Sequence, residues 1–263
     1  MALSDRYRLE REIGAGGMAT VFLAEELRHQ RPVAVKVLRP ELSAALGHDR
    51  FRRELTTAAG VRHPHIVPLY DSGEAAGFLF YVVPFVEGES LRDRLAREGP
   101  LPIEDALRFA DEIASALSYA HGRGILHRCL TPDSILLEHG HAMVADVGIA
   151  QAVSAASDAT PVVASMDIAT PTYTSPEQSS GAVIDARSDL YALGCIVYEM
   201  LAGSPPFTGP TATALMVRHA IEPVPKLGAR RANVPKPVID AVEGALAKSP
   251  VDRFASVEEW RRA

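Results

Sequence analysis

Cysteine is scarce in this sequence, and Cys129 and Cys195 are its two representatives among 263 residues. Two cysteines are too few for a disulfide framework or a cysteine-based metal cluster. Such a composition is typical of a chain that works in a reducing compartment, so we expect a cytoplasmic location.

Long hydrophobic runs are also missing. The most apolar stretch, residues 190–202, is interrupted by Glu199 and is too short to span a bilayer. Residues 1–11 are rich in charge and lack the apolar core of a signal peptide. We therefore expect neither a secretion signal nor a membrane segment in this chain.

An excess of basic charge, the usual mark of a nucleic-acid partner, is absent as well. The chain has 27 Lys and Arg against 33 Asp and Glu, a formal net charge of -6, with the two signs interspersed. We therefore expect no nucleic-acid partner. Hydrophobic residues make up 47% and charged residues 23%, which is ordinary for a globular protein. A chain of this length can bury a sizeable core without disulfides or metals.

The first third of the chain has the pattern of a small sheet with one helix. A helical pattern covers residues 49–59 and ends at Gly60. Runs rich in β-branched and aromatic residues predict strands. These runs are residues 7–13, 20–24, 32–38, 66–70 and 78–83.

Beyond a connector at residues 87–89 the pattern becomes mainly helical. Ser90 with Asp93 makes a helix cap before residues 91–96. Apolar residues recur at helical spacing from Ile103 to His121, which predicts a long amphipathic helix. Short strands are expected at 135–137 and 143–145, a long aperiodic segment at 150–175, and further helices at 187–203, 211–221, 235–248 and from 256 onward. Together with the sheet, this indicates the α+β class.

A glycine cluster, Gly14-Ala15-Gly16-Gly17, lies between the first two predicted strands. Glycines let backbone amides approach phosphate groups closely, so the cluster is a candidate phosphate-binding loop. Taken alone it is equally well explained as a glycine-rich hairpin turn. A dinucleotide-binding loop fits less well, because a strand and not a helix follows the glycines.

Two charged residues, Lys36 and Glu54, follow in the next predicted strand and helix. Lys36 ends the apolar run Val33-Ala34-Val35 in a predicted strand, and a buried lysine needs a partner. Glu54, on the next predicted helix, is the natural candidate. Separately, Lys36 could be an exposed edge-strand lysine and Glu54 part of a solvated helix face.

A third charged position comes after the short strand near 143–145. Asp146-Val147-Gly148 places a carboxylate at a strand end before a glycine, which suits a Mg²⁺ ligand. The alternative is a simple Asp-x-Gly turn.

In order and spacing these motifs resemble those of protein kinases, and the resemblance covers essentially the whole chain. It is closest to the bacterial Ser/Thr kinases of eukaryotic type. The residues that carry it are 14–21, 33–36, Glu54, 62–67, His127-Arg128, Asp146-Val147-Gly148, Thr170, 173–178, 185–191 and Arg253. The resemblance implies a two-lobed kinase fold, with an N-lobe at 1–84, a hinge at 85–89 and a C-lobe at 90–263.

The same resemblance implies ATP and Mg²⁺, with one metal ion, as cofactors. Lys36 would contact the α- and β-phosphates and pair with Glu54, and Asp146 would hold the metal. Pro84 lacks an N–H group, so hydrogen bonds from the hinge would come from its neighbours. The residues implied around the nucleotide are Ile13, Gly14, Gly16, Gly17, Val21, Ala34, Lys36, Glu54, Val83, Phe85 and Val86.

The catalytic loop departs from the family pattern, which is His-Arg-Asp, one residue, Lys-Pro, one residue, Asn. Here Cys129 replaces the aspartate that positions the substrate hydroxyl and accepts its proton. Loss of a general base costs about 10²–10⁴ in rate. Thr131 replaces the lysine that neutralises the transferring phosphoryl group, and such a donor is often worth about 3–4 kcal/mol.

Ser134 stands where the family has the asparagine that holds a second Mg²⁺, and a serine hydroxyl is a weaker metal ligand. Asp133 is the one nearby carboxylate that could substitute as a base, but it would have to swing round Pro132, so it is a poor candidate. Val147 replaces a usual phenylalanine, and we expect looser coupling between the Glu54 helix and the Asp146 segment.

Other matching positions have structural or regulatory roles in the family. Glu177 and Arg253 would form a buried ion pair, and Asp189 would hold the backbone of the catalytic loop. Residues 151–174 correspond to the activation segment. Its Ser and Thr residues could accept phosphate, and Arg128 could receive that phosphate.

These motifs and departures are compatible with three functions. The first is a pseudokinase that binds nucleotide but lacks efficient phosphotransfer and acts through conformation or a protein partner. The second is a Ser/Thr protein kinase of low activity, which transfers the ATP γ-phosphate to protein Ser or Thr. The third is an interaction module that binds no nucleotide, and Pro84 in the hinge is its best support. The sequence identifies neither the protein partner or substrate nor the oligomeric state.

Overall fold

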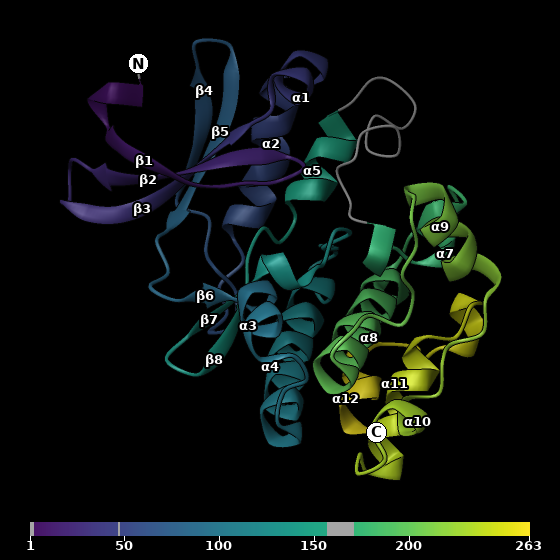
Figure 1. Ribbon diagram of the computed structural model, residues 1–263. Helices are drawn as coiled ribbons and strands as arrows, with labels where there is room; N and C mark the ends of the chain where they lie inside the picture. The colour runs from purple at the N-terminus through teal and green to yellow at the C-terminus, as the bar shows by residue number, and fades with distance from the viewer. Residues whose placement is uncertain (1–2, 47, 157–170) are drawn as a thin grey trace.

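The computed structural model describes residues 3–46, 48–156 and 171–263. An antiparallel sheet with adjacent helices forms one part of the molecule, and a larger, mainly helical part lies beside it (Figure 1). The α+β two-lobed fold predicted from the sequence is therefore confirmed. In the part of the chain that the structure describes, no helix is long and apolar enough to cross a membrane.

The N-lobe sheet is five-stranded, in the order β1-β2-β3-β5-β4. All neighbouring strands run antiparallel. The register pairs Lys36 of β3 with Val21 of β2 on one side and with Tyr81 of β5 on the other. The strands are β1 (Tyr7–Ala15), β2 (Ala19–Glu26), β3 (Arg31–Leu38), β4 (Asp71–Ala75) and β5 (Phe78–Pro84).

Two helices lie beside this sheet, α1 (Pro40–Ala45) and α2 (His48–Ala59) (Figure 1). Helix α2 was expected, whereas α1 was not. The predicted strand at 66–70 was wrong, because the fourth strand is β4, at Asp71–Ala75. Ile66 forms one parallel bridge to Val144, and the backbone N–H of Val67 donates to the carbonyl of Val144, so this apolar run packs against the C-lobe.

The C-lobe is built around two long buried helices, α4 (Ile103–His121) and α8 (Ala186–Ala202), which pack against each other. Nearly all of α8 is buried, which explains why its sequence is mostly apolar from Leu190 onward. Further helices in the described part of the C-lobe include α3 (Leu91–Glu98), α7 (Pro176–Ser179), α9 (Ala212–Ile221), α10 (Leu227–Arg230), α11 (Lys236–Ala245) and α12 (Val257–Arg262). Short 3-10 turns lie at Leu3–Asp5, Pro132–Ser134, Pro171–Tyr173 and Pro250–Asp252.

A small second sheet stands where the two lobes meet, in the order β6-β7-β8 (Figure 1). Its strands are β6 (Glu89–Ser90), β7 (Ile135–Glu138) and β8 (His141–Val144). The chain from α4 to β7 carries the His127-Arg128-Cys129 loop, and Asp146 follows β8 directly. Ser90 and Asp93 cap α3 reciprocally, as predicted.

Helix α5 (Ile149–Ala156) corrects the prediction of an aperiodic segment beginning at residue 150. Its apolar residues Ile149, Ala152 and Val153 are buried in the same cluster as Phe51 and Leu55 of α2. This packing, and not periodicity over a long stretch, defines the helix. The rest of the expected segment up to residue 170 lies outside the described residues.

Candidate functional site

The glycine cluster forms the tip of the β1–β2 hairpin. Gly14 pairs with Val21 across the hairpin, and the N–H of Gly16 donates to the carbonyl of Ala19 at 2.9 Å. A Cβ atom at Gly14 would meet nothing within 4 Å, and one at Gly16 would meet only the carbonyl of Ala19, at 3.9 Å. Packing within the fold therefore does not require glycine at either position. The open space beside the backbone fits a phosphate-binding loop.

Lys36 and Asp146 meet directly. The Lys36 ammonium donates to both carboxylate oxygens of Asp146 at 2.7 Å. The Tyr81 hydroxyl donates to Oδ1 of the same carboxylate at 2.9 Å. Burial acts to raise the pKa of Asp146, but the charge and hydrogen bonds of Lys36 outweigh burial and hold this pKa below its ordinary value. The two residues that the resemblance assigns to phosphate and metal are thus bonded directly to each other.

Glu54 does not pair with Lys36, contrary to the expectation from the resemblance. In the described residues, which include Lys36, Glu54 and Asp146, the ammonium of Lys36 bonds Asp146 and no ion pair joins Lys36 to Glu54. Helix α5 packs against α2, and Gly148 lies where the two meet. Gly148 has φ +81°, and a Cβ there would come within 3.1 Å of Ala58 on α2.

An apolar cluster surrounds this polar centre and joins the two lobes. It contains Ala34 and Val83 of the sheet, with Val21 and Val86 packed at its edge. Ile13 belongs to the same edge, and Phe85 is half-buried in the segment after β5. Such a surface suits a flat heterocyclic base.

Leu136 and Met143 also pack against this cluster, from β7 and β8. The sequence reasoning missed both residues. Both residues lie in short strands that are far from the glycine cluster in the sequence. The apolar character of those strands was the only feature that could have indicated their place in the cluster.

Asp189 of α8 holds the catalytic loop in place. Its carboxylate accepts hydrogen bonds from the backbone N–H groups of His127 at 2.8 Å and Arg128 at 2.7 Å. It also contacts Nε2 of His121 at 2.8 Å. Arg128 has φ +66°, a left-handed conformation that these contacts hold in place. The loop is therefore rigidly positioned, as expected for Asp189.

Cys129 lies half-buried at the position where the family has its aspartate. Burial, with a contribution from the Asp189 charge, raises the pKa of the Cys129 thiol to about 12. The side chain is consequently neutral at physiological pH. A neutral thiol neither accepts a proton nor orients a substrate hydroxyl as a carboxylate does.

Thr131 and Ser134 satisfy each other locally. The Ser134 hydroxyl accepts from the Thr131 N–H at 3.1 Å and donates to the Thr131 carbonyl at 2.8 Å. Ser134 is also buried. Its oxygen is therefore occupied within the loop, which leaves little capacity for a metal ion.

Asp133 faces a cation. Its carboxylate lies 3.5 Å from Nε of Arg92 on α3, and Arg92 also donates to Glu199 at 2.9 Å. The Arg92 guanidinium donates to the Tyr173 hydroxyl, which in turn donates to Glu199. Asp133 thus takes part in a network that ties α3 to the segment before α7. This arrangement makes it a poorer candidate base still.

Val147 is buried. It lines a small cavity of about 10 Å³ together with Ala58 of α2, Tyr81 and Asp146. Val147 therefore lies against the helix that carries Glu54. The looser coupling expected between this helix and the Asp146 segment stays a prediction.

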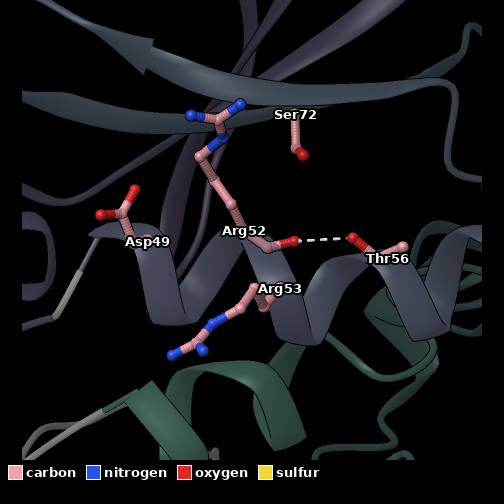
Figure 2. Close-up of a pocket in the computed structure, with 5 residues that line it drawn as sticks. All are labelled: Asp49, Arg52, Arg53, Thr56 and Ser72. Carbon is pink, nitrogen blue, oxygen red and sulfur yellow. Dashed lines mark hydrogen bonds between the residues drawn. The ribbon is translucent and has the colours of Figure 1, made fainter.

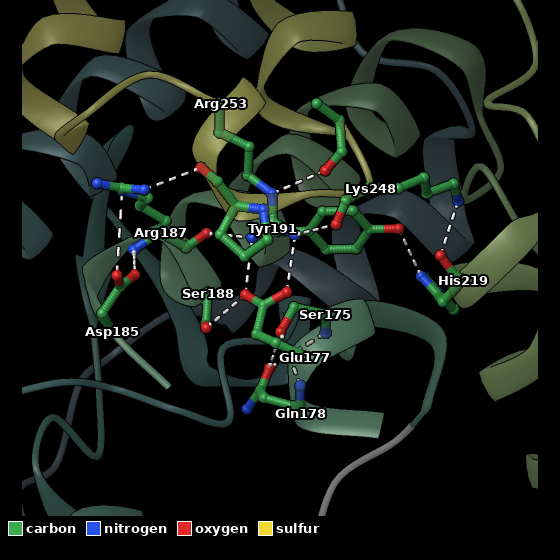
Figure 3. A network of polar contacts seen from close by, with 12 residues as sticks. Ser175, Glu177, Gln178, Asp185, Arg187, Ser188, Tyr191, His219, Lys248 and Arg253 are labelled. Carbon is green, nitrogen blue, oxygen red and sulfur yellow. Dashed lines mark hydrogen bonds and ion pairs between the residues drawn. The ribbon is translucent and has the colours of Figure 1, made fainter. Parts of the chain in front are cut away.

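Glu177 and Arg253 form a bidentate buried ion pair with N–O distances of 2.7 and 2.8 Å. Figure 3 shows Glu177 between Ser188 and Arg253, and the Ser188 hydroxyl donates to it at 2.6 Å. Burial alone would raise the pKa of Glu177, but Arg253 and Ser188 lower it below its ordinary value. The expected structural pair is present. It joins α7 to the chain after α11.

A surface hollow of about 630 Å³ lies elsewhere, over α2 and β4 (Figure 2). Its lining residues are Asp49, Arg52, Arg53, Thr56 and Ser72. None of them is a predicted nucleotide residue, and the side chains of Arg52 and Arg53 point to opposite sides of α2 (Figure 2). This hollow is therefore separate from the Lys36–Asp146 centre. Among the described residues no group of three or more His, Cys, Asp or Glu could hold a metal ion.

Comparison with known proteins identifies the family of the chain. The family model for the protein kinase domain matches residues 7–261, so the chain belongs to the protein kinase family.

Its relatives include serine/threonine-protein kinases of bacteria. PknB of Mycobacterium tuberculosis is 42% identical over 266 residues, which cover 98% of this chain and 42% of PknB. PknB of Mycolicibacterium smegmatis is 43% identical, with the same coverage. PrkC of Bacillus subtilis is 37% identical over 263 residues, covering 98% of this chain and 40% of PrkC. The chain thus spans about two fifths of the length of these relatives.

Proposed function

We propose that this chain is a nucleotide-binding protein kinase domain that lacks efficient phosphotransfer, a pseudokinase with a signalling or scaffolding role. ATP would lie between an N-lobe at 1–84 and a C-lobe at 90–263, joined by a hinge at 85–89. A reducing cytoplasmic setting suits its two unpaired cysteines.

One observation carries the proposal: the position of the catalytic carboxylate holds a neutral thiol. The pKa of Cys129 is raised to about 12, so the thiolate is a minute fraction at pH 7. Phosphoryl transfer depends on positioning and on electrostatic stabilisation, with an aspartate at this point to orient the nucleophile. The loop around Cys129 is held by Asp189 and cannot readily bring another group to the same place.

The neighbouring changes act in the same direction. Thr131 provides no positive charge for the transferring group, and the Ser134 hydroxyl is engaged with the Thr131 backbone. Asp133 is engaged with Arg92. Because residues of a catalytic unit act together, these losses need not add, but each one alone would slow transfer.

The nucleotide half has the groups that ATP and one Mg²⁺ require. The open backbone at Gly14 and Gly16 suits the phosphates, and Lys36 would move from Asp146 to them. Mg²⁺ is commonly held by one or two carboxylates together with phosphate oxygens. Asp146 would supply such a carboxylate, and Ser134 at most a minor ligand. Val83, Phe85 and Val86 would line the adenine, with the hinge hydrogen bonds coming from groups other than Pro84.

A Ser/Thr protein kinase of low activity is the second candidate. The relatives are named serine/threonine-protein kinases, and the supports of the loop, Asp189 and the Glu177–Arg253 pair, are complete. The third candidate, an interaction module without nucleotide, has only Pro84 in its favour.

Calorimetric titration with ATP, with and without Mg²⁺, tests the nucleotide-binding half of the proposal. We expect saturable binding by the wild-type chain and none by Lys36→Ala, because the substitution removes the phosphate-binding cation. A chain that binds no ATP at millimolar concentration would be the interaction module instead.

A further inference from the structure

Tyr81 occupies an unusual place at the proposed nucleotide site. It stands directly opposite Lys36 in the β3–β5 register, so both side chains extend from the same face of the sheet. Its ring centroid lies 5.8 Å from the Lys36 ammonium, and its hydroxyl donates to Asp146. Tyr81 is therefore close to both charged residues of the centre.

The Tyr81 hydroxyl depends on Asp146 for its hydrogen bond. Tyr81 is only 2% exposed, so water does not replace a lost partner. Its ring belongs to the apolar cluster that contains Phe51 and Leu55 of α2. A buried hydroxyl that loses its acceptor carries a desolvation penalty. Any ligand that draws Asp146 away must therefore overcome this penalty.

A metal ion would draw on the same carboxylate. Lys36 and Tyr81 together donate to both Asp146 oxygens, and Oδ1 receives a hydrogen bond from each. ATP phosphates can release Lys36 by taking its charge. They offer no alternative acceptor to Tyr81, because this buried β5 residue packs in the cluster that contains Phe51 and Leu55 of α2. Once Lys36 leaves, Oδ2 is open to a metal, but Oδ1 keeps the hydrogen bond from Tyr81, so the carboxylate is restrained from turning to present both oxygens.

We propose that Tyr81 is a positioning residue that restrains Asp146 and makes nucleotide binding only weakly dependent on Mg²⁺. The proposal rests on the proposed nucleotide-binding function and specifies its metal requirement. If Tyr81 only filled space, replacing it with phenylalanine would leave the Mg²⁺ dependence unchanged, since phenylalanine has nearly the same volume.

The test is a calorimetric comparison of ATP affinity in EDTA and in excess Mg²⁺ for the wild-type chain and Tyr81→Phe. We expect Mg²⁺ to change the wild-type affinity by less than about threefold, and to strengthen the Tyr81→Phe affinity roughly tenfold. The metal-free affinities of the two proteins should be equal.

Tyr7→Phe is the matched control, because the Tyr7 hydroxyl donates to Asp71 at 2.7 Å from the same sheet and Tyr7 is also buried. It should behave as wild type. Tyr81→Leu serves as a second variant if Tyr81→Phe is poorly folded. We expect Mg²⁺ to strengthen its ATP affinity by the same factor.

ATP binding with the same Mg²⁺ dependence in wild type and both Tyr81 variants would overturn this inference and leave the proposed function intact. An equal gain in Tyr7→Phe would overturn it too. If wild type and variants bind no ATP in either buffer, the proposed function itself fails, and this inference with it.

Discussion

The chemistry of a single thiol decides much of what this catalytic loop can do. Cys129 is held by its surroundings in the neutral form, with a pKa raised to about 12 by burial and by Asp189. The position of the loop does not depend on that thiol, since Asp189 holds the backbone of His127 and Arg128, the two residues directly before it. A substitution at residue 129 therefore changes the chemistry of the loop without changing how its backbone is held.

The raised pKa of Cys129 gives a prediction about its reactivity. The thiolate is the nucleophile, so alkylation by iodoacetamide at pH 8 should be at least about a hundredfold slower than in the denatured chain. The rate should still rise with pH between 7 and 9, because the folded pKa lies above that window. Peptide mass spectrometry separates Cys129 from Cys195, which is fully buried. Rapid alkylation of Cys129 at neutral pH would indicate an active thiolate.

The buried charge of Glu177 gives a prediction about stability. Glu177→Gln leaves Arg253 buried without its counter-charge, which should lower the free energy of unfolding by about 3–5 kcal/mol. Because the folded pKa of Glu177 is depressed, its contribution is present above the unfolded pKa and is lost as pH falls through the folded one. The variant should therefore lose less stability than wild type on acidification.

Urea denaturation at pH 7 and at pH 4 measures both effects. Glu258→Gln is the control, because Glu258 pairs with Arg262 on the surface and such pairs contribute at most about 1 kcal/mol. A Glu177 variant no less stable than that control would rule out a structural role for the pair.

The roles of many of these residues could be predicted from sequence, because kinase-like motifs specify both the type of each residue and its order along the chain. Asp189, Glu177 and Arg253 stand in the contacts expected of them. The partner of Lys36 could not be predicted, because it depends on how far α2 stands from β3. The contact of Tyr81 was also missed, since an apolar strand gives no signal of a hydroxyl aimed at Asp146.

At the scale of elements, the packing of α5 against α2 is the feature that most shapes the site. Helix α5 follows directly after Asp146-Val147-Gly148 and contributes Val153, fully buried, to the cluster of the N-lobe. Its position is consistent with Glu54 standing apart from Lys36. The setting of α2 is thus coupled to the segment that follows the metal-ligand candidate.

Val153→Ala should loosen this packing. Removing two buried methyl groups should cost about 1–3 kcal/mol, and amide hydrogen exchange should rise in α2 and α5 but not in α8. Val183→Ala is the control, because Val183 is 90% exposed and should change stability by less than about 0.5 kcal/mol. Unchanged exchange in α2 would mean that the two helices do not depend on each other.

Elements were predictable where the pattern was long and periodic, as in α4 and α8, or bounded by turns, as in β3 and β5. Strand β4 was misplaced because its sequence, Asp-Ser-Gly-Glu-Ala, is polar, while the apolar run before it contacts β8 across the lobes. Helix α5 was missed because eight residues rich in alanine carry too little periodicity to distinguish a helix from a loop.

At the scale of the whole molecule, ATP should stabilise the fold if it binds between the lobes. A ligand at a hundred times its Kd adds about 2.7 kcal/mol to the stability of the folded state. For a domain of this size that corresponds to a rise in Tm of roughly 5–10 °C. Thermal unfolding with ATP should show this rise in wild type and none in Lys36→Ala. A flat response in wild type would favour the interaction module.

We propose that the pocket holds ATP but that the loop cannot pass the γ-phosphate of ATP to a hydroxyl. Transfer of labelled phosphate from ATP to a basic protein substrate measures this directly, with wild type, Lys36→Ala and the triple variant C129D/T131K/S134N side by side. We predict that wild type matches the Lys36→Ala background and that the triple variant exceeds it by at least about a hundredfold. Wild-type turnover of about 1–100 s⁻¹, the range of ordinary kinases, would contradict the account.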